Sequence, residues 1–165
     1  MNHQIFLETP VGNLQIRGTE HVITAVVWPQ QQDPGNKSEL SPGTETPALL
    51  AEAAKQLTAY FAGDLHYFDL PLAAEGTEFQ HRVWQQLSAI PFGNTTSYGA
   101  IAQALGAPKA ARAVGTAIGR NPLAIMVPCH RVIGRNGALT GFAGGVDVKR
   151  RLLDLERQQN TPARF

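Results

Sequence analysis

The chain has 165 residues, of which 43% are apolar and 16% charged. This composition supports a buried core, excludes a disordered tail protein, and suits one compact domain or two small ones. The single cysteine excludes a disulfide framework and a cysteine-rich zinc finger. No stretch approaches the roughly 20 apolar residues of a membrane span, and the N-terminus lacks a signal-peptide pattern. We therefore expect a soluble, cytoplasmic protein without a membrane partner.

The net charge of +1 hides an uneven distribution of charge. Residues 1–75 carry 3 Lys/Arg against 9 Asp/Glu, a balance of −6, whereas residues 76–165 carry 11 against 4, a balance of +7. The 68 residues 79–146 contain six basic residues and no Asp or Glu. Because a solvated surface normally mixes both signs, this stretch predicts a phosphate-binding surface. The alternative is a chance composition of an Ala/Gly-rich segment.

Residues 1–75 predict a small α/β domain that ends in a linker. Short alternating runs over residues 4–28 predict two or three antiparallel strands that begin with a hairpin. Residues 29–47 hold four prolines and two glycines and predict an exposed loop. Apolar side chains at helical spacing over residues 48–62 predict a helix, and residues 64–76 predict a short strand and a linker.

Residues 76–165 predict a mainly helical second domain. The expected helices cover residues 78–90, 98–105 and 108–118, with a last one capped by Asp147. Thr77 begins a capping-box pattern, and Ser97 can cap the second helix. Ala102 and Gly106 allow the second and third helices to cross closely, which predicts a helix-turn-helix. Many helical bundles also contain such a corner.

Extended chain is expected between the third helix and the last one. The apolar run at residues 125–127 predicts a buried strand. Asn136 and Gly137, which lie between apolar residues, predict a two-residue hairpin turn.

The lone cysteine lies in the run Pro128-Cys129-His130-Arg131. A lone cysteine is most often a small buried hydrophobe. Here, however, Pro128 constrains the backbone, and a helical turn beginning at Pro128 would place Cys129 at its positive end. His130 and Arg131 add two potential cations. Because these influences lower the pKa of a thiol, we expect Cys129 to be a nucleophilic thiolate.

His130 is the nearest candidate base. Adjacent residues on regular structure point apart, so His130 is expected to act on Cys129 through a water or a local turn. A carboxylate should orient the imidazole, and residues 79–146 provide none. Glu156 on the last helix is therefore the candidate acid. The alternative for Glu156 is an ordinary exposed helix charge.

The third predicted helix is built mainly from Ala and Gly, with Arg112 as its long side chain. A helix that reads the major groove needs several Gln, Asn, Arg or Ser residues to reach base edges. Small residues instead allow close approach to a narrow groove, with Arg112 reaching into the base stack. The alternative is a core helix with Arg112 merely solvated.

Three segments together resemble the O6-alkylguanine-DNA alkyltransferases, also called methylated-DNA–protein-cysteine methyltransferases, of the bacterial single-module type. They are Lys-Ala-Ala-Arg-Ala-Val-Gly at 109–115, Gly-Arg-Asn-Pro at 119–122 and Pro-Cys-His-Arg-Val-Ile-Gly at 128–134. The resemblance covers about residues 76–157 and is weaker over residues 1–75. It implies an α/β fold class: a ribonuclease-H-like α/β roll, then a helical, winged-helix-like domain with the helix-turn-helix.

The resemblance also implies a function. Such a protein would bind alkylated double-stranded DNA through the minor groove, largely independently of sequence, and flip the damaged base out. It would then transfer the alkyl group of O6-alkylguanine, and of O4-alkylthymine, irreversibly to its own cysteine. It would need no cofactor and no metal, and it would be a monomer that can associate along DNA. The four-cysteine metal domain of the regulatory members is not found in this sequence.

The family motif assigns roles to residues of this chain. Cys129 would accept the alkyl group, His130 would be the base acting through water, and Glu156 would orient His130. The supporting catalytic residues would be Asn121, which holds the turn before the active site, Tyr98, which rotates the nucleotide, and Lys149, which assists the leaving group.

Two further sets would contact the nucleic acid. The DNA-binding set is Thr95, Ser97, Tyr98, Lys109, Ala110, Ala111 and Arg112. Among these, Arg112 would replace the flipped base in the stack. The base-binding set is Ile118, Val132, Phe142 and Ala143. Phe142 and Ala143 stand where many relatives have Tyr and Ser, so hydroxyl contacts to the base would be absent.

Two other classes of function remain as alternatives. A non-catalytic damage sensor would bind alkylated DNA without transfer, but family members of that kind replace the cysteine that this chain retains as Cys129. A cysteine hydrolase would require an oxyanion hole and repeated turnover on an acyl substrate.

Overall fold

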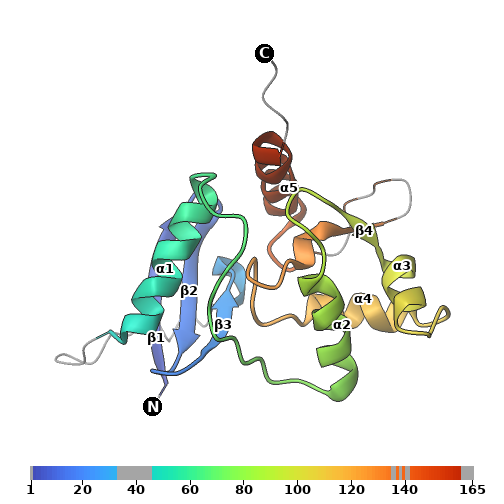
Figure 1. The fold of residues 1–165 in the computed structure, drawn as a ribbon, viewed down its shortest axis with the longest axis horizontal. Coiled ribbons are helices and arrows are strands. Elements are labelled where there is room, and N and C mark those ends of the chain that lie inside the picture. The colour runs from blue at the N-terminus through green and yellow to red at the C-terminus, as the bar shows by residue number, and fades with distance from the viewer. Residues whose placement is uncertain (1, 33–45, 135–136, 138, 140–141, 161–165) are drawn as a thin grey trace. The chain divides into compact units, whose positions relative to one another are not determined.

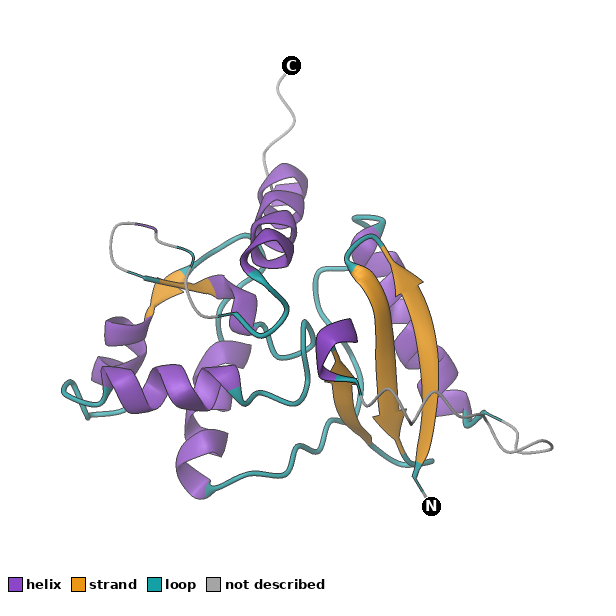
Figure 2. Ribbon diagram, turned by 180° about the vertical axis from the view of Figure 1, so that it is seen from behind, coloured by secondary structure: helices purple, strands orange, loops and turns teal. Residues whose placement is uncertain are grey.

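The structure is a computed structural model that describes residues 2–32, 46–134, 137, 139 and 142–160. The chain divides into two compact units (Figures 1 and 2). One comprises residues 1–75 and 122–126, and the other comprises residues 76–121 and 127–165. The first change of unit falls between Glu75 and Gly76, as in the predicted division. Residues 122–126 differ from that division because they group with the first unit.

The first unit is built on an antiparallel sheet of three strands in chain order, the larger of the two strand numbers predicted. The strands are β1 (His3–Thr9), β2 (Gly12–Gly18) and β3 (Ile23–Val27). Gly12 closes the first hairpin with a φ of +108°, and a Cβ there would lie 2.9 Å from Cγ of Pro29. Glycine is therefore needed at this turn for both its backbone conformation and its small size.

One helix covers a face of this sheet (Figure 1). It is α1 (Ala48–Phe61), which lies within the predicted helix and buries one apolar stripe, formed by Leu50, Ala53, Leu57 and Tyr60. A short 3-10 turn, η1 (Pro29–Gln31), follows β3. The loop predicted over residues 29–47 lies mostly outside the described residues.

Single backbone contacts, not full strands, extend β3. The Ile23 N–H donates to the Pro71 carbonyl, and the Val26 N–H donates to the Pro122 carbonyl, both at 2.8 Å. Leu72 makes only an isolated bridge, so the short strand predicted within residues 64–76 is reduced to one pairing.

The strand predicted at residues 125–127 is wrong. Ile125 has a φ of +69°, and the Met126 N–H donates back to the Ala124 carbonyl at 2.8 Å. A β-branched residue in the left-handed region is strained and ends extended pairing. The run is apolar because it is buried, and burial alone does not distinguish a strand from a tight turn.

The second unit is mainly helical, which together with the first unit confirms the predicted mixed α/β class. Its elements are α2 (Glu78–Ser88), β4 (Thr96–Ser97), α3 (Tyr98–Ala104), α4 (Ala111–Gly119), η3 (Cys129–Arg131), β5 (Val132–Ile133) and α5 (Val146–Asn160). Thr77 and Gln80 form the predicted capping box through bonds of 3.1 and 2.9 Å. Ser97 caps α3 by accepting the Ala100 N–H at 3.1 Å.

α3 and α4 form the predicted helix-turn-helix corner, and both pack against α2. Gly106 ends α3 with a φ of +73°. α4 begins at Ala111 and not at residue 108, because the Ala110 N–H donates to the Ala107 carbonyl at 2.8 Å and closes a separate turn. This turn supplies the length of chain that redirects α4 across α3. Inside the corner, Trp84 Nε1 donates to the Ala117 carbonyl at 2.9 Å.

A two-residue parallel pairing joins the start of the helix-turn-helix to the cysteine turn. Thr96 pairs with Val132, and Ser97 pairs with Ile133. α5 begins at Val146, so Asp147 lies in its first turn and not at the predicted cap position. The predicted hairpin turn includes Asn136, which lies outside the described residues.

Candidate active site

Cys129 opens a single 3-10 turn, η3, whose geometry follows from its sequence. Pro128 has a φ of −81° and a ψ of +68° and caps the turn, and it was expected as the first residue of the turn. The Arg131 N–H donates to the Pro128 carbonyl at 3.1 Å, and the Cys129 N–H donates to the Val127 carbonyl at 2.8 Å. The backbone on both sides of the sulfur is therefore fixed by local hydrogen bonds.

The thiol of Cys129 is buried, with 6% of the residue exposed. Burial raises its pKa above the ordinary value of 9.0, although a hydrogen bond from Asn121 and the charge of Lys149 act in the opposite direction. The predicted low-pKa thiolate is therefore wrong for the free protein. A turn at the cysteine was predicted correctly, but His130 is neutral and Arg131 is paired with Glu156, so the cation that acts on the sulfur is Lys149. The loss of water around the sulfur outweighs its effect.

Asn121 connects the end of α4 to the cysteine turn. Its Nδ2 donates to the Val127 carbonyl at 2.9 Å, and its side chain also bonds the Cys129 sulfur. One amide therefore fixes the backbone two residues before the cysteine and provides a polar partner for the thiol.

A buried network of charges lies behind the cysteine. His130 Nε2 is 2.5 Å from Glu156 Oε2, and Arg131 Nε donates to Glu156 Oε1 at 2.8 Å. His130, Arg131 and Glu156 are 0%, 5% and 1% exposed. The predicted pairing of Glu156 with His130 is present, and the alternative of an exposed helix charge is excluded.

The segment that follows α2 completes this network. Arg131 Nη1 donates to the Ile90 carbonyl at 2.7 Å, and the Gly93 N–H donates to Glu156 Oε1 at 3.3 Å. The guanidinium carbon also lies 5.6 Å from the ring centroid of Phe92. The network therefore ties together the cysteine turn, α5 and the chain between α2 and β4.

The network sets the protonation of its members. Burial raises the pKa of Glu156, but the bonds and charges of His130 and Arg131 outweigh this effect and bring it from 4.5 to about 2. The pKa of His130 is lowered from 6.5, chiefly by burial, with Arg131 and Lys149 acting in the same direction and Glu156 opposing them. Glu156 is therefore ionised and His130 neutral near pH 7.

His130 has one ring nitrogen without a partner. Within the described part of the chain, Nδ1 is the one buried side-chain nitrogen or oxygen that lacks a hydrogen bond. A neutral imidazole with a buried, unpaired nitrogen on the residue after a thiol is a suitable proton acceptor.

Lys149 approaches the sulfur from α5. It is 1% exposed, and its Nζ lies 5.7 Å from the ring centroid of Phe142. Burial lowers its pKa from 10.5, whereas the charge of Cys129 acts to raise it. A thiolate formed at Cys129 would therefore have a buried cation near it.

Four residues of the predicted DNA-binding set, Lys109, Ala110, Ala111 and Arg112, lie at or just before the start of α4. Arg112 is exposed on α4, and its guanidinium has no hydrogen-bond or ion-pair partner among the described residues. It lines a groove of about 600 Å³ together with Lys109, Ala110, Thr77 and Gln80. Ala111 begins α4 and is half-buried.

Tyr98 lies at the start of α3 and faces α4. A Cβ on Gly115 would lie 3.7 Å from Cδ1 of Tyr98, so the glycine leaves the ring close to the backbone of α4. Of the predicted base contacts, Ile118 and Val132 are buried, whereas Phe142 and Ala143 are half-buried just before α5. Phe142 contacts Lys149, the residue that approaches the sulfur from α5.

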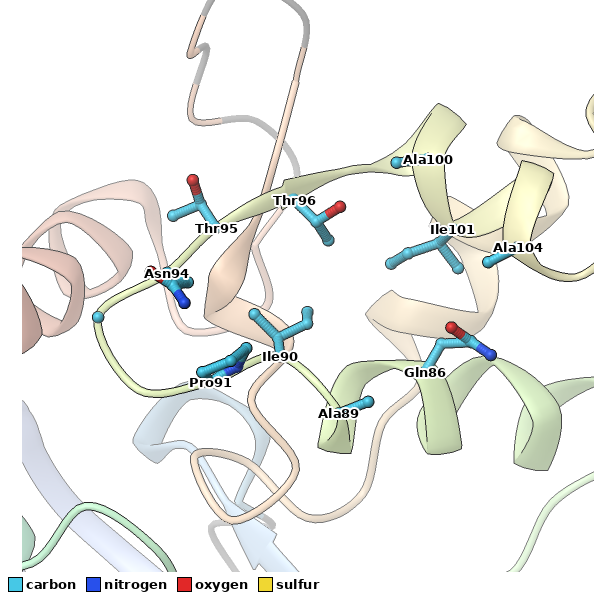
Figure 3. Close-up of a pocket in the computed structure, with 11 residues that line it drawn as sticks. Gln86, Ala89, Ile90, Pro91, Asn94, Thr95, Thr96, Ala100, Ile101 and Ala104 are labelled. Carbon is cyan, nitrogen blue, oxygen red and sulfur yellow. The ribbon is translucent and has the colours of Figure 1, made fainter.

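A second groove of about 630 Å³ lies between the end of α2, the following segment and α3 (Figure 3). Figure 3 shows Thr95 and Thr96 on the extended segment that leads to α3. Thr95 belongs to the predicted DNA-binding set, whereas Ser97 does not line this groove. Ile90 and Gly93, whose backbone bonds the charge network, form part of its wall.

The sequence did not indicate that Arg131 would pair with Glu156. Arg131 was considered only as a cation near the thiol. The signal that was available is the acid-free stretch itself: a buried arginine within residues 79–146 must find its carboxylate outside that stretch, and Glu156 was already the candidate acid.

No group of three His, Cys, Asp or Glu side chains in the described residues could hold a metal ion. None of the helices in that part of the chain is long and apolar enough to cross a bilayer.

Comparison with known families gives two matches that together span most of the chain. The model of the 6-O-methylguanine DNA methyltransferase ribonuclease-like domain matches residues 2–74. The model of the 6-O-methylguanine DNA methyltransferase DNA binding domain matches residues 78–158. The two matches meet where the chain changes unit.

Individual proteins are similar over nearly the whole length. A methylated-DNA–protein-cysteine methyltransferase of Mycolicibacterium paratuberculosis is 49% identical over 154 residues, which are 93% of this chain and 92% of the relative. The crystal structure of Mycobacterium tuberculosis O6-methylguanine methyltransferase has a TM-score of 0.86 and 46% identity, covering 99% of this chain and 97% of that one. A Mycobacterium tuberculosis structure in complex with DNA has a TM-score of 0.81 and 46% identity, covering 96% and 93%.

Proposed function

Since this chain belongs to the methylated-DNA–protein-cysteine methyltransferase family, which repairs DNA by moving an alkyl group to a protein cysteine, we propose that Cys129 is the acceptor. The observation that carries the proposal is the arrangement around the chain's single sulfur. Asn121 and Lys149 act on the thiol, and the residue after it is a neutral histidine held by a buried carboxylate.

The raised pKa of Cys129 makes a base necessary for the reaction. His130 takes the thiol proton on its free Nδ1, through a water, and Glu156 orients the ring from Nε2. The thiolate then attacks the alkyl carbon on O6. The new S–C bond forms as the C–O6 bond breaks, and the electron pair of that bond passes to the guanine.

Lys149 balances charge during this transfer. Its buried cation favours the thiolate and then the negative charge on the departing guanine, which becomes neutral when it takes up a proton. Because the product is a thioether with no easy leaving group, the sulfur stays alkylated. The reaction is therefore stoichiometric and ends after one event for each chain.

DNA is the partner, and we propose that it is bound through its minor groove by the helix-turn-helix. Small residues of α4 allow close approach, and Arg112 takes the place of the extruded base in the stack. Tyr98 helps rotate the nucleotide, and Thr95, Ser97 and Lys109 contact the backbone near Ala110 and Ala111. The extruded base then meets Val132, Phe142, Ala143 and the end of α4 at Ile118.

The same proposal covers the substrates and the cellular setting. O6-alkylguanine is the main substrate, with O4-alkylthymine as a second one because it also carries an alkyl carbon on an exocyclic oxygen. The protein acts as a monomer in the cytoplasm, with no cofactor.

A mass measurement tests the acceptor. After incubation with a duplex that contains O6-methylguanine, the peptide with Cys129 should gain the mass of one methyl group. Cys129→Ser should bind the duplex and gain none. Undamaged duplex is the matched control. A folded wild-type protein that gains no methyl, or gains it on another residue, would show that the proposed acceptor is wrong.

A further inference from the structure

Glu156 is engaged on both of its oxygens, and Arg131 contacts each of them. Oε1 accepts from Arg131 Nε at 2.8 Å and from the Gly93 N–H at 3.3 Å. Oε2 lies 2.5 Å from His130 Nε2 and accepts from Arg131 Nη2 at 3.2 Å. The guanidinium therefore spans the carboxylate in two places and shares Oε2 with the imidazole.

The contact between His130 and Glu156 has a consequence for the tautomer of the ring. An ionised carboxylate can only accept hydrogen bonds, so the hydrogen in the 2.5 Å contact must sit on Nε2. A neutral imidazole with its hydrogen on Nε2 carries its lone pair on Nδ1. That atom is the buried nitrogen without a partner among the described residues.

We propose that Arg131 is a positioning residue for alkyl transfer: its two-point contact keeps Glu156 a carboxylate, and Glu156 in turn fixes His130 as the Nε2–H tautomer, with Nδ1 directed to the Cys129 proton. This inference rests on the proposed role of His130 as the base. In the step itself one proton leaves Sγ and arrives on Nδ1, which leaves a thiolate and an imidazolium.

Arg131 is itself held in place by contacts beyond those with Glu156. Its third donor group, Nη1, bonds the Ile90 carbonyl at 2.7 Å, and its guanidinium carbon lies over the ring of Phe92. Three fixed directions of hydrogen bonding match the planar fork of arginine, and a lysine at 131 could satisfy only part of them. The carboxylate is thereby held in one orientation against the imidazole.

The positive charge of Arg131 also partly offsets the effect of the Glu156 charge on His130. The charged groups that act on His130 are Glu156 and Lys149 from α5 and Arg131 from its own turn, and the neutral thiol of Cys129 precedes it. The segment after α2 contributes only the uncharged Ile90, Phe92 and Gly93 to the network. Without the guanidinium, its positive charge would no longer oppose protonation of the ring, so the pKa of His130 would rise and Nδ1 would take up a proton at a higher pH.

Nitrogen NMR of the histidine ring in the free protein tests this directly. In wild-type protein labelled with 15N-histidine at pH 7, His130 should show a protonated Nε2 and an unprotonated Nδ1. In Arg131→Met, Nδ1 should become protonated at a pH about one unit or more higher than in wild type, and Arg131→Lys should give an intermediate shift. Arg150→Met, which removes an exposed arginine from α5, is the control and should match wild type.

The pH dependence of single-turnover transfer provides the second readout. The rate should rise with pH as His130 loses its proton, and the midpoint should move up by about one pH unit or more in Arg131→Met. Arg131→Lys should restore much of the shift. If Arg131→Met does not fold, the Arg131→Lys midpoint and spectrum decide the outcome.

Each outcome separates this inference from the proposed function. A wild-type ring protonated on Nδ1, or a folded Arg131→Met or Arg131→Lys protein with unchanged spectrum and midpoint, would overturn the role of Arg131. A wild-type protein with the expected tautomer that transfers no methyl group would instead overturn the proposed acceptor and leave the tautomer assignment in place.

Discussion

The cysteine turn and α4 belong to the same unit and use an arginine in opposite ways. Arg131 in the turn is 5% exposed and bonds Glu156 and Ile90. Arg112 on α4 is exposed, and its guanidinium has no partner within the described residues. A buried arginine must be paired inside the fold, whereas an exposed one is available to DNA. The buried arginine therefore fits the alkyl transfer proposed for the turn, and the exposed one fits the DNA recognition proposed for α4.

Glu156→Gln should lower the stability of the protein more than any other change proposed here, because it leaves Arg131 buried without its ion-pair partner. We expect the free energy of unfolding to fall by about 3–5 kcal/mol, as measured by urea denaturation. Asp154→Asn on the exposed side of the same helix is the control and should change it by less than about 0.5 kcal/mol. Similar small changes in both variants would mean that the buried network does not stabilise the turn.

The same network predicts how stability depends on pH. The pKa of Glu156 is lowered from 4.5 to about 2 on folding, so its contribution is complete above pH 4.5 and is lost as pH falls toward 2. The pKa of His130 is also lowered, so the unfolded chain binds its proton first as pH drops below 6.5. Both effects reduce stability in acid, by about 3 kcal/mol for Glu156 alone.

Urea denaturation at a series of pH values measures this dependence. Subtracting the curve of Glu156→Gln gives the pH-dependent contribution of the carboxylate together with its coupling to His130. A difference between the two proteins that stays constant from pH 6.5 to pH 2 would contradict the assigned ionisation.

Arg112→Ala tests the role of the exposed arginine on α4. Stability should change by less than about 0.5 kcal/mol, since the side chain is exposed. Repair of O6-methylguanine in a duplex should slow by about tenfold, because extrusion costs a few kcal/mol of unstacking that the arginine offsets. Repair in a single strand should be nearly unchanged. Equal rates for variant and wild type on the duplex would exclude the intercalating role.

Lys109→Gln should give the smallest of the expected effects, a modest loss of affinity for DNA. Lys109 lies beside Arg112 in the groove next to α4, where it can contact a phosphate. Affinity for DNA should weaken to a similar extent on damaged and undamaged duplexes, and the slope of log affinity against log salt should decrease by about one. An unchanged slope would place Lys109 outside the interface.

Local features of the fold could be predicted because they depend on neighbouring residues. Thr77 and Ser97 cap the helices that their sequence positions indicate, and Gly106 ends α3 in the left-handed conformation. The pairing of His130 with Glu156 could also be anticipated, because the absence of acids over a long stretch left few candidates.

Features that depend on packing could not be predicted in this way. The pKa of Cys129 is set chiefly by burial, which the neighbouring cations do not indicate. Ile125 is apolar as a strand residue would be, yet it adopts a left-handed turn. The partner of Arg131 lies 25 residues away on α5, and only the folded arrangement selects it.

The number of methyl groups accepted by each chain tests the central claim most directly. With O6-methylguanine duplex in large excess, radioactive methyl transfer should rise to one group for each chain and then stop, with all of the label on Cys129. Continued transfer beyond one group for each chain would contradict a permanent thioether at the buried cysteine.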